Sequence, residues 1–399
     1  MRRLDFGQYP GVPEQVLRMI SANMPNGSMC SGLRELTWAA KPRTLPFFRL
    51  FLSPHLTKFS LTYTTRDTHD ARPSIASAIL ELEALPLRHF SLAWYVGKTT
   101  RQLFESGLPS VLFSAVSSTV LRCGNSLTTL LIPAPLLNTA IQHVMRLPKL
   151  TTWAAWNGPP MVPALSLSDA FPQLETLDLY TNESLQWLPL FEATARHTSS
   201  GQASHLSSHR GPGQGLISLT SWVGVSVNTA FISPIMLFHG LVNLSLKSSC
   251  SSTGGCTFCL TDGDMAEVTA ALPHLGDARF GDVCSTNTCR TTVSSLHHFS
   301  SRCKSLGFLQ IHFNTANLRD DLERLSIDPQ LHDTDSALRR PVVLLLSKAP
   351  VSIGEGDIGP VLTGLLKIFP SLNNIQGDGA RWRELNSRLR NGRETPEFV

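Results

Sequence analysis

The chain has 399 residues, of which 42% are hydrophobic and 16% charged, with a formal net charge of +4. This length suits two or three ordinary domains or one elongated array, and the apolar content is enough for a large core. No run of Lys or Arg accompanies the small net charge, which disfavours a nucleic-acid-binding protein that relies on a dense basic patch.

The first residues, MRRLDFGQYPGVPEQ, lack the apolar segment of a secretory signal peptide, so we expect a soluble cytoplasmic or nuclear protein. Residues 217–246 contain no Asp, Glu, Lys or Arg, but Asn, Pro, His and Gly residues interrupt them. Two buried strands around a helix fit this segment better than a membrane span does.

A short pattern, Pro-x-Leu-x-x-Φ-x-Φ with Φ an apolar residue, recurs along the chain. Clear copies are PHLTKFSL from Pro54, PKLTTWAA from Pro148, PQLETLDL from Pro172, PHLGDARF from Pro273 and PSLNNI from Pro370. Counting looser copies, the first leucine falls at residues 33, 56, 87, 127, 150, 174, 241, 275, 306 and 372. Most gaps are between 23 and 40 residues, which is the range of leucine-rich repeats, and the wider gaps leave room for weaker copies near Leu219 and Val343.

Helical spacing of apolar residues precedes most copies, at 74–84, 136–147, 262–272, 318–326 and 357–369. Each unit then supplies a helix, a turn and a short strand that cannot bury its leucines alone. We therefore predict an α/β leucine-rich-repeat solenoid, with parallel strands on the concave face and helices outside. It forms one irregular array over 1–399, with a flexible Ser/Gly/His-rich loop at 195–215 and a C-terminal cap or tail at 376–399.

Asp262, Asp264 and Glu267 lie close together in one of these units, and two readings are possible. The spacing matches an EF-hand loop poorly, because Pro273 stands where that loop needs its last acidic ligand. Thr261 lies three residues before Asp264, as in a capping box at the start of a helix. The pattern therefore favours a helix cap over a metal site.

Gly354, Gly356 and Gly359 form a G-x-G-x-x-G motif, the signature of a dinucleotide-binding turn. However, Glu355 and Asp357 put carboxylates where a pyrophosphate would lie, and no second βαβ unit surrounds the motif. We expect a repeat loop with a helix cap and no cofactor.

Six of the eight cysteines lie between residues 250 and 303. Cys256, Cys259, Cys284 and Cys289 form two close pairs that could hold a structural zinc ion, although the spacer between the pairs exceeds the usual zinc-ribbon range. Reduced structural thiols and a disulfide are the alternatives. Motifs of the common hydrolases and metalloproteases do not occur in the sequence, so we expect no enzymatic activity.

Several segments resemble the leucine-rich region of fungal F-box proteins, namely LPKLTTWAAWNGPP, FPQLETLDLY, LTDGDMAEVTAALPHLGDARFGD and CKSLGFLQIHFNT. The resemblance implies a protein-interaction solenoid that presents a substrate to a ubiquitin ligase. An F-box does not precede the first repeat here, so an F-box-binding adaptor and a cullin are expected as partners only if an F-box lies upstream of Met1. The alternative is a repeat-only scaffold, with zinc at the cysteines as a possible brace.

The residues between the apolar positions of each copy should face the concave side of the sheet, because successive side chains of a strand point to opposite faces. Aromatic and Arg side chains are frequent hot spots of protein interfaces. The partner-binding residues expected on this basis are Trp156, Asp178, Tyr180, Lys247, Arg279 and His312. Packing of Trp156 and Tyr180 beneath the following loops is the alternative.

Overall fold

The computed structural model describes most of the predicted repeats. The described residues are 2–6, 13–24, 28–40, 43–64, 72–95, 110–132, 136–156, 172–181, 216–223, 227–248, 258–281, 290–315, 317–326, 340–346, 354–377 and 379–394. They fall into two compact units, Met1–Tyr180 and Thr181–Val399. The loop predicted at 195–215 lies outside the described residues, and the arrangement as one array stays a prediction.

The first unit alternates strands with helical segments. Its elements, in chain order, are β1 (Arg3–Asp5), α1 (Glu14–Asn23), β2 (Glu35–Ala40), η1 (Leu45–Phe51), β3 (Lys58–Thr64), α2 (Arg72–Leu80), β4 (His89–Tyr95), α4 (Ser110–Arg122), η2 (Gly124–Ser126), β5 (Thr129–Ile132), α5 (Asn138–Met145), β6 (Thr152–Trp156) and β7 (Thr176–Thr181). Each strand pairs in parallel with the next one along the chain, from β1 to β7.

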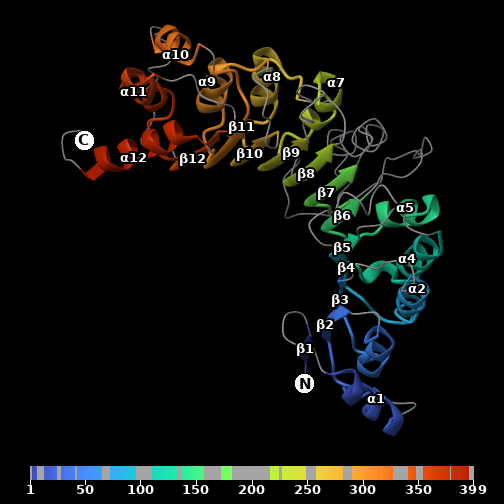
Figure 1. Ribbon diagram of the computed structural model, residues 1–399. Helices are drawn as coiled ribbons and strands as arrows, with labels where there is room; N and C mark the ends of the chain where they lie inside the picture. Colours follow the sequence, from blue (N-terminus) through green and yellow to red (C-terminus); the bar gives the residue numbers. More distant parts are fainter. Residues whose placement is uncertain are drawn as a thin grey trace. The chain divides into compact units, whose positions relative to one another are not determined.

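The second unit repeats this arrangement. Its elements are β8 (Ser218–Val223), α7 (Thr229–Ile232), η4 (Ile235–Leu237), β9 (Asn243–Ser248), α8 (Asp262–Ala271), β10 (Asp277–Phe280), α9 (Val293–Arg302), β11 (Phe308–Ile311), α10 (Leu318–Ser326), β12 (Val342–Leu346), η7 (Glu355–Asp357), α11 (Ile358–Ile368), β13 (Leu372–Gln376) and α12 (Ala380–Glu394). Strands β8 to β13 are again parallel and in sequence order. In each unit the helices that connect strands lie on one face of the sheet (Figure 1).

Both units therefore have a solenoid-like α/β fold with an unclosed, all-parallel sheet. The predicted helices agree closely with α5, α8, α10 and α11, whereas α2 ends at Leu80 rather than at residue 84. Residues 217–246 form β8, α7, η4 and most of β9, as predicted. Among the described residues, no helix is both long and apolar enough to cross a membrane.

The first leucine of every copy is buried, with at most 3% of its surface exposed at any of the ten positions. Burying a leucine side chain contributes about 2 kcal/mol, so each of these positions stabilises its repeat. Within the strands, burial alternates between half-exposed and buried residues, as in β5, β10 and β11. The alternation leaves one face of each sheet packed against helices and the other accessible.

Neighbouring repeats are joined by a recurring backbone contact. The carbonyl oxygen of Arg34 accepts the amide N–H groups of both Thr57 and Lys58, at 2.9 and 3.0 Å. The same arrangement opens β10, where the carbonyl of Val242 accepts from Gly276 and Asp277. Across the described residues the oxygens of Arg2, Arg34, Thr57, Arg88, Thr128, Thr151, Ile217, Val242 and Gly276 each accept two such bonds.

The acidic cluster at the start of α8 is a cap that also joins three helices. Thr261 and Asp264 form the predicted capping box, and Asp264 also accepts a hydrogen bond of 2.7 Å from the hydroxyl of Thr229 at the start of α7. Asp262 accepts bonds from the backbone and hydroxyl of Thr292, the N-cap residue of α9, at 2.7 Å each. The two carboxylates thus connect the N-termini of consecutive helices.

We predict that Asp264→Ala lowers the free energy of unfolding by about 1 kcal/mol or more at neutral pH, because a capping box is lost. Partial burial raises the pKa of Asp264, but the bonds from Thr229 and Thr261 outweigh it, and the pKa lies below its ordinary value. The difference between wild type and variant should therefore shrink as the pH falls below about 4.

Urea unfolding followed by circular dichroism at pH 7 and at pH 3 measures this difference. Glu267→Ala is the matched control, since Glu267 is an exposed residue of the same helix. A difference between wild type and Asp264→Ala that stays constant over this pH range would contradict the role of the ionised carboxylate.

Candidate functional site: the open face of the sheet

The face of each sheet that the connecting helices leave uncovered is called the open face here. In the first unit it carries a row of side chains in register, Arg3, Glu35, Lys58 and His89, followed by Thr129, Thr152 and Thr176. Arg3 lies 3.9 Å from Glu35, between its Nε and the carboxylate Oε2. Burial and the neighbouring charge of Lys58 lower the pKa of His89, so the imidazole is neutral at physiological pH.

The open face of the second unit has two in-register rows of half-exposed residues. One row is Ser218, Asn243, Asp277, Phe308 and Val343. The other is Thr220, Ser245, Arg279, Gln310 and Leu345. The surface is therefore polar over β8 and β9, charged over β10 and largely apolar over β11 and β12.

Arg279 is the most tightly held side chain of these rows. Its Nε and Nη2 donate to the two carboxylate oxygens of Asp277 at 2.8 and 2.7 Å. The guanidinium carbon lies 4.5 Å from the centre of the Phe308 ring on the next strand. The hydrogen bond to Asp277 raises the pKa of Arg279, and its side chain is still 38% exposed. A charged group is thus fixed in place with donors left over for a partner.

The sequence pattern places Asp277 and Phe308 on the same face as Arg279, but the prediction did not name them as supports of its guanidinium. Asp277 and Phe308 occupy the same kind of open-face position, one at the start of β10 and one at the start of β11. The signal was available, because Asp-x-Arg within a strand places both side chains on one face and the next copy places Phe308 beside Asp277.

Four other residues of the predicted surface, Trp156, Asp178, Tyr180 and Lys247, lie in strands β6, β7 and β9. Asp178 is half-exposed on β7, in register with Ala154 of β6. Trp156 and Tyr180 pair in register at the ends of β6 and β7, and Lys247 lies in β9. The side chains of these last three residues lie outside the described part of the chain, so their role stays a prediction.

The prediction for His312 is wrong. This residue was expected on the open face, but only 1% of its surface is exposed. Strand β11 ends at Ile311, so the alternation of the strand does not extend to His312. Its ring packs directly against Gly281, where an added Cβ atom would lie 2.3 Å from the ring carbon Cδ2. The backbone of Gly281 has φ of +84°, a conformation that favours glycine.

The zinc prediction cannot be placed on the structure. Cys256, Cys284 and Cys289 lie outside the described residues, and Cys259 is half-buried beside β-bridge residue Phe258. In the described part, no three His, Cys, Asp or Glu side chains converge in a way that could hold a metal ion. Burial raises the pKa of the Cys123 and Cys303 thiols to about 12, so both are protonated at neutral pH.

The glycine-rich segment before α11 is a 3-10 turn, η7, that leads into the helix. The helix cap predicted in this segment is not formed by a side chain. Asp357 occupies the N-cap position without bonding the helix backbone, and its carboxylate accepts a bond of 2.6 Å from Arg319 of α10 instead.

We predict that Gly281→Ala destabilises the protein by more than 1 kcal/mol, because the new methyl group would clash with His312 and strain the backbone. Gly307→Ala is the matched control, since its nearest neighbours lie 3.8 Å from the added atom. Thermal unfolding of both variants measures the effect. An equal, small shift of the two melting temperatures would contradict the close packing of His312 on Gly281.

In comparisons with known proteins, no protein-family profile and no curated protein matches the chain.

Proposed function

We propose that this chain is a leucine-rich-repeat protein whose open face binds another protein, with Arg279 as a central contact. The observation that carries the proposal is the guanidinium of Arg279, which is held between Asp277 and Phe308 and remains accessible. An arginine that is already ordered loses little conformational entropy on binding. Arginine is also among the residues that most often dominate the energy of an interface.

The surroundings of Arg279 support a protein partner. Half-exposed apolar side chains from β11 and β12 lie beside it, and hydroxyl and amide side chains from β8 and β9 lie on its other side. An apolar centre next to groups that form hydrogen bonds is typical of protein interfaces. The spacing of the buried leucines and the parallel strands favour a leucine-rich-repeat array, which commonly uses its sheet face in this way.

The partner that we propose is a substrate protein of a ubiquitin ligase, on the strength of the resemblance to fungal F-box proteins. In this proposal the chain has no catalytic role and acts by holding the substrate. An adaptor and a cullin belong to the complex only if the protein in the cell carries an F-box upstream of Met1. Without them, the same open face would serve a scaffold that brings other proteins together.

We expect Arg279→Ala and Phe308→Ala to weaken partner binding about tenfold each, a loss of about 1.4 kcal/mol that is typical of interface hot spots. Tagged wild type and variants are purified from the native cells, and the proteins that accompany them are quantified by mass spectrometry. Lys367→Ala is the control, because Lys367 is exposed on helix α11. Circular dichroism establishes that all variants are folded.

A co-purifying protein that is lost from both open-face variants and retained by the control would identify the partner. The proposal fails if the wild type and both open-face variants retain the same proteins in the same amounts. The ligase part has its own readout in the same data, because recovery of the adaptor and cullin supports it and their absence alongside a specific partner removes it.

A further inference from the structure

Helix α12 carries most of the net charge of the protein. Its sequence, ARWRELNSRLRNGRE, has five arginines and two glutamates, a net charge of +3, compared with +4 for the whole chain. The sequence prediction treated this segment only as a cap or tail. The concentration of charge on one helix raises the question of what the arginines contact.

The buried side of α12 determines where its arginines lie. Trp382, Leu385 and Leu389 are at most 3% exposed. Asn386 is on the same side, turned toward the strand, where its Oδ1 accepts a hydrogen bond of 3.0 Å from the amide of Ile375 in β13. With 100° of rotation per residue, this buried stripe separates the described arginines into two pairs on opposite flanks of the helix. These pairs are Arg381 with Arg388 and Arg383 with Arg390.

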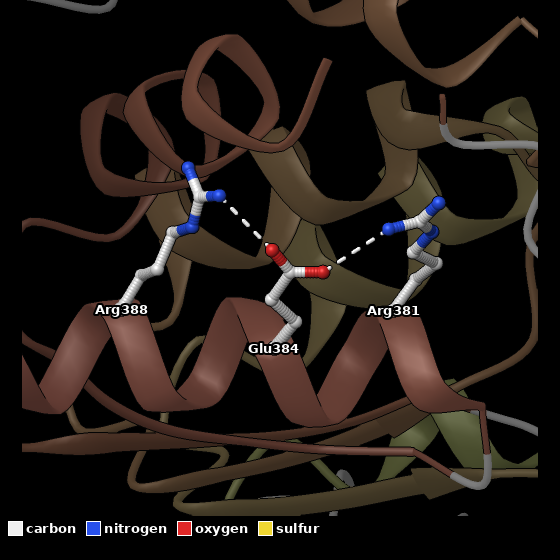
Figure 2. Close-up of polar contacts among 3 residues, drawn as sticks. All are labelled: Arg381, Glu384 and Arg388. Carbon is white, nitrogen blue, oxygen red and sulfur yellow. Dashed lines mark hydrogen bonds and ion pairs between the residues drawn. The ribbon is translucent and has the colours of Figure 1, made fainter. Parts of the chain in front are cut away.

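The first pair shares one carboxylate within the helix. Figure 2 shows Arg381 and Arg388 reaching toward Glu384 from both sides, on the same flank of α12. Arg381 donates to one carboxylate oxygen at 3.2 Å and Arg388 to the other at 2.9 Å. Both oxygens of Glu384 are therefore engaged, and the single carboxylate offsets part of the charge of the two arginines.

Among the described side chains, the second pair has no carboxylate partner. Arg383 and Arg390 are exposed, and within the described residues no carboxylate forms an ion pair with either of them. Arg383 also lies in the first turn of α12, where the helix dipole disfavours a positive charge and no acidic residue is present. Stabilisation of the helix therefore does not explain this arginine.

The geometry of the pair defines what it can bind. The two residues are seven positions apart, so their side chains start about 10 Å apart along the helix. They lie on the flank next to Asn386, which is the flank beside edge strand β13. Two guanidinium groups at this separation match two carboxylates of one partner segment, since each guanidinium can hold a carboxylate with two parallel hydrogen bonds.

We propose that Arg383 and Arg390 form a docking site for an acidic segment of a protein partner. Nucleic acid fits less well, because phosphate-backbone binding uses a longer array of cations than two uncompensated arginines. A membrane surface also fits less well, because the apolar stripe of α12 is buried in the protein and is not available for insertion. The site does not depend on the role proposed for Arg279.

Fluorescence anisotropy with a labelled ten-residue polyglutamate peptide tests the site at low salt. The double variant Arg383→Gln/Arg390→Gln is compared with Arg381→Gln/Arg388→Gln, which removes the same charge from the same helix. We expect the first variant to weaken peptide binding about tenfold and the second to change it by less than about threefold. Arg279→Ala should leave peptide binding unchanged, which separates this site from the open face.

Three results would overturn the proposal. Equal weakening by both double variants would mean that only net charge matters. Absence of peptide binding to the wild-type protein would mean that the flank is not a carboxylate site. Tighter binding of a single-stranded RNA of equal charge, or of vesicles with anionic lipids, lost in the same variant, would assign the flank to that class of ligand instead.

Discussion

The structure depends on a backbone contact in which one carbonyl oxygen serves two amide groups of the next repeat. A carbonyl oxygen has two lone pairs, so it can accept both bonds without leaving another donor unsatisfied. The contact fixes the start of each strand relative to the one before it, for example β3 relative to β2 through the oxygen of Arg34. Because this start is the same from β1 to β7 and from β8 to β11, the open-face residues of these strands come into register as rows. The pairing of β12 with β13 departs from it, since the register shifts between Val342 and Val343.

Register on the strand side is matched by connections on the helix side. In the second unit, Asp264 links the start of α8 to Thr229, and Asp262 links it to Thr292 at the start of α9. Arg319 of α10 reaches Asp357 before α11 in a similar way. Neighbouring repeats of this unit are thus connected at both layers, which braces the surface around Arg279 that we propose for binding. Such pre-organisation lowers the entropic cost of binding.

Sequence periodicity was sufficient for the parts of the fold that rest on local patterns. The first leucines and the helix at 262–272 follow from spacing and capping alone, because burial in a repeat depends on the alternation along a strand and the turn of a helix.

His312 shows the limit of this reasoning. It continues the alternation of β11 on paper, but the strand ends before it, and the positive φ of Gly281 opens the space that its ring fills. Similarly, the partners of Asp262 lie about thirty residues away along the chain, where spacing gives no information. The pairing of Arg381 and Arg388 with Glu384 was readable from helical offsets. That no described carboxylate pairs with Arg383 or Arg390 could be seen only in the structure.

The contact between Asn386 and Ile375 has a consequence for how the protein avoids unwanted association. The last strand of a parallel sheet offers a row of backbone donors and acceptors to any passing strand. In β13 the amide of Ile375 is occupied by the side chain of Asn386, and α12 packs over the strand through Trp382. The helix thus hinders the addition of a further strand beside β13. Proteolytic removal of α12 would free the backbone amide of Ile375 and expose the edge of β13 to pairing with strands of other molecules.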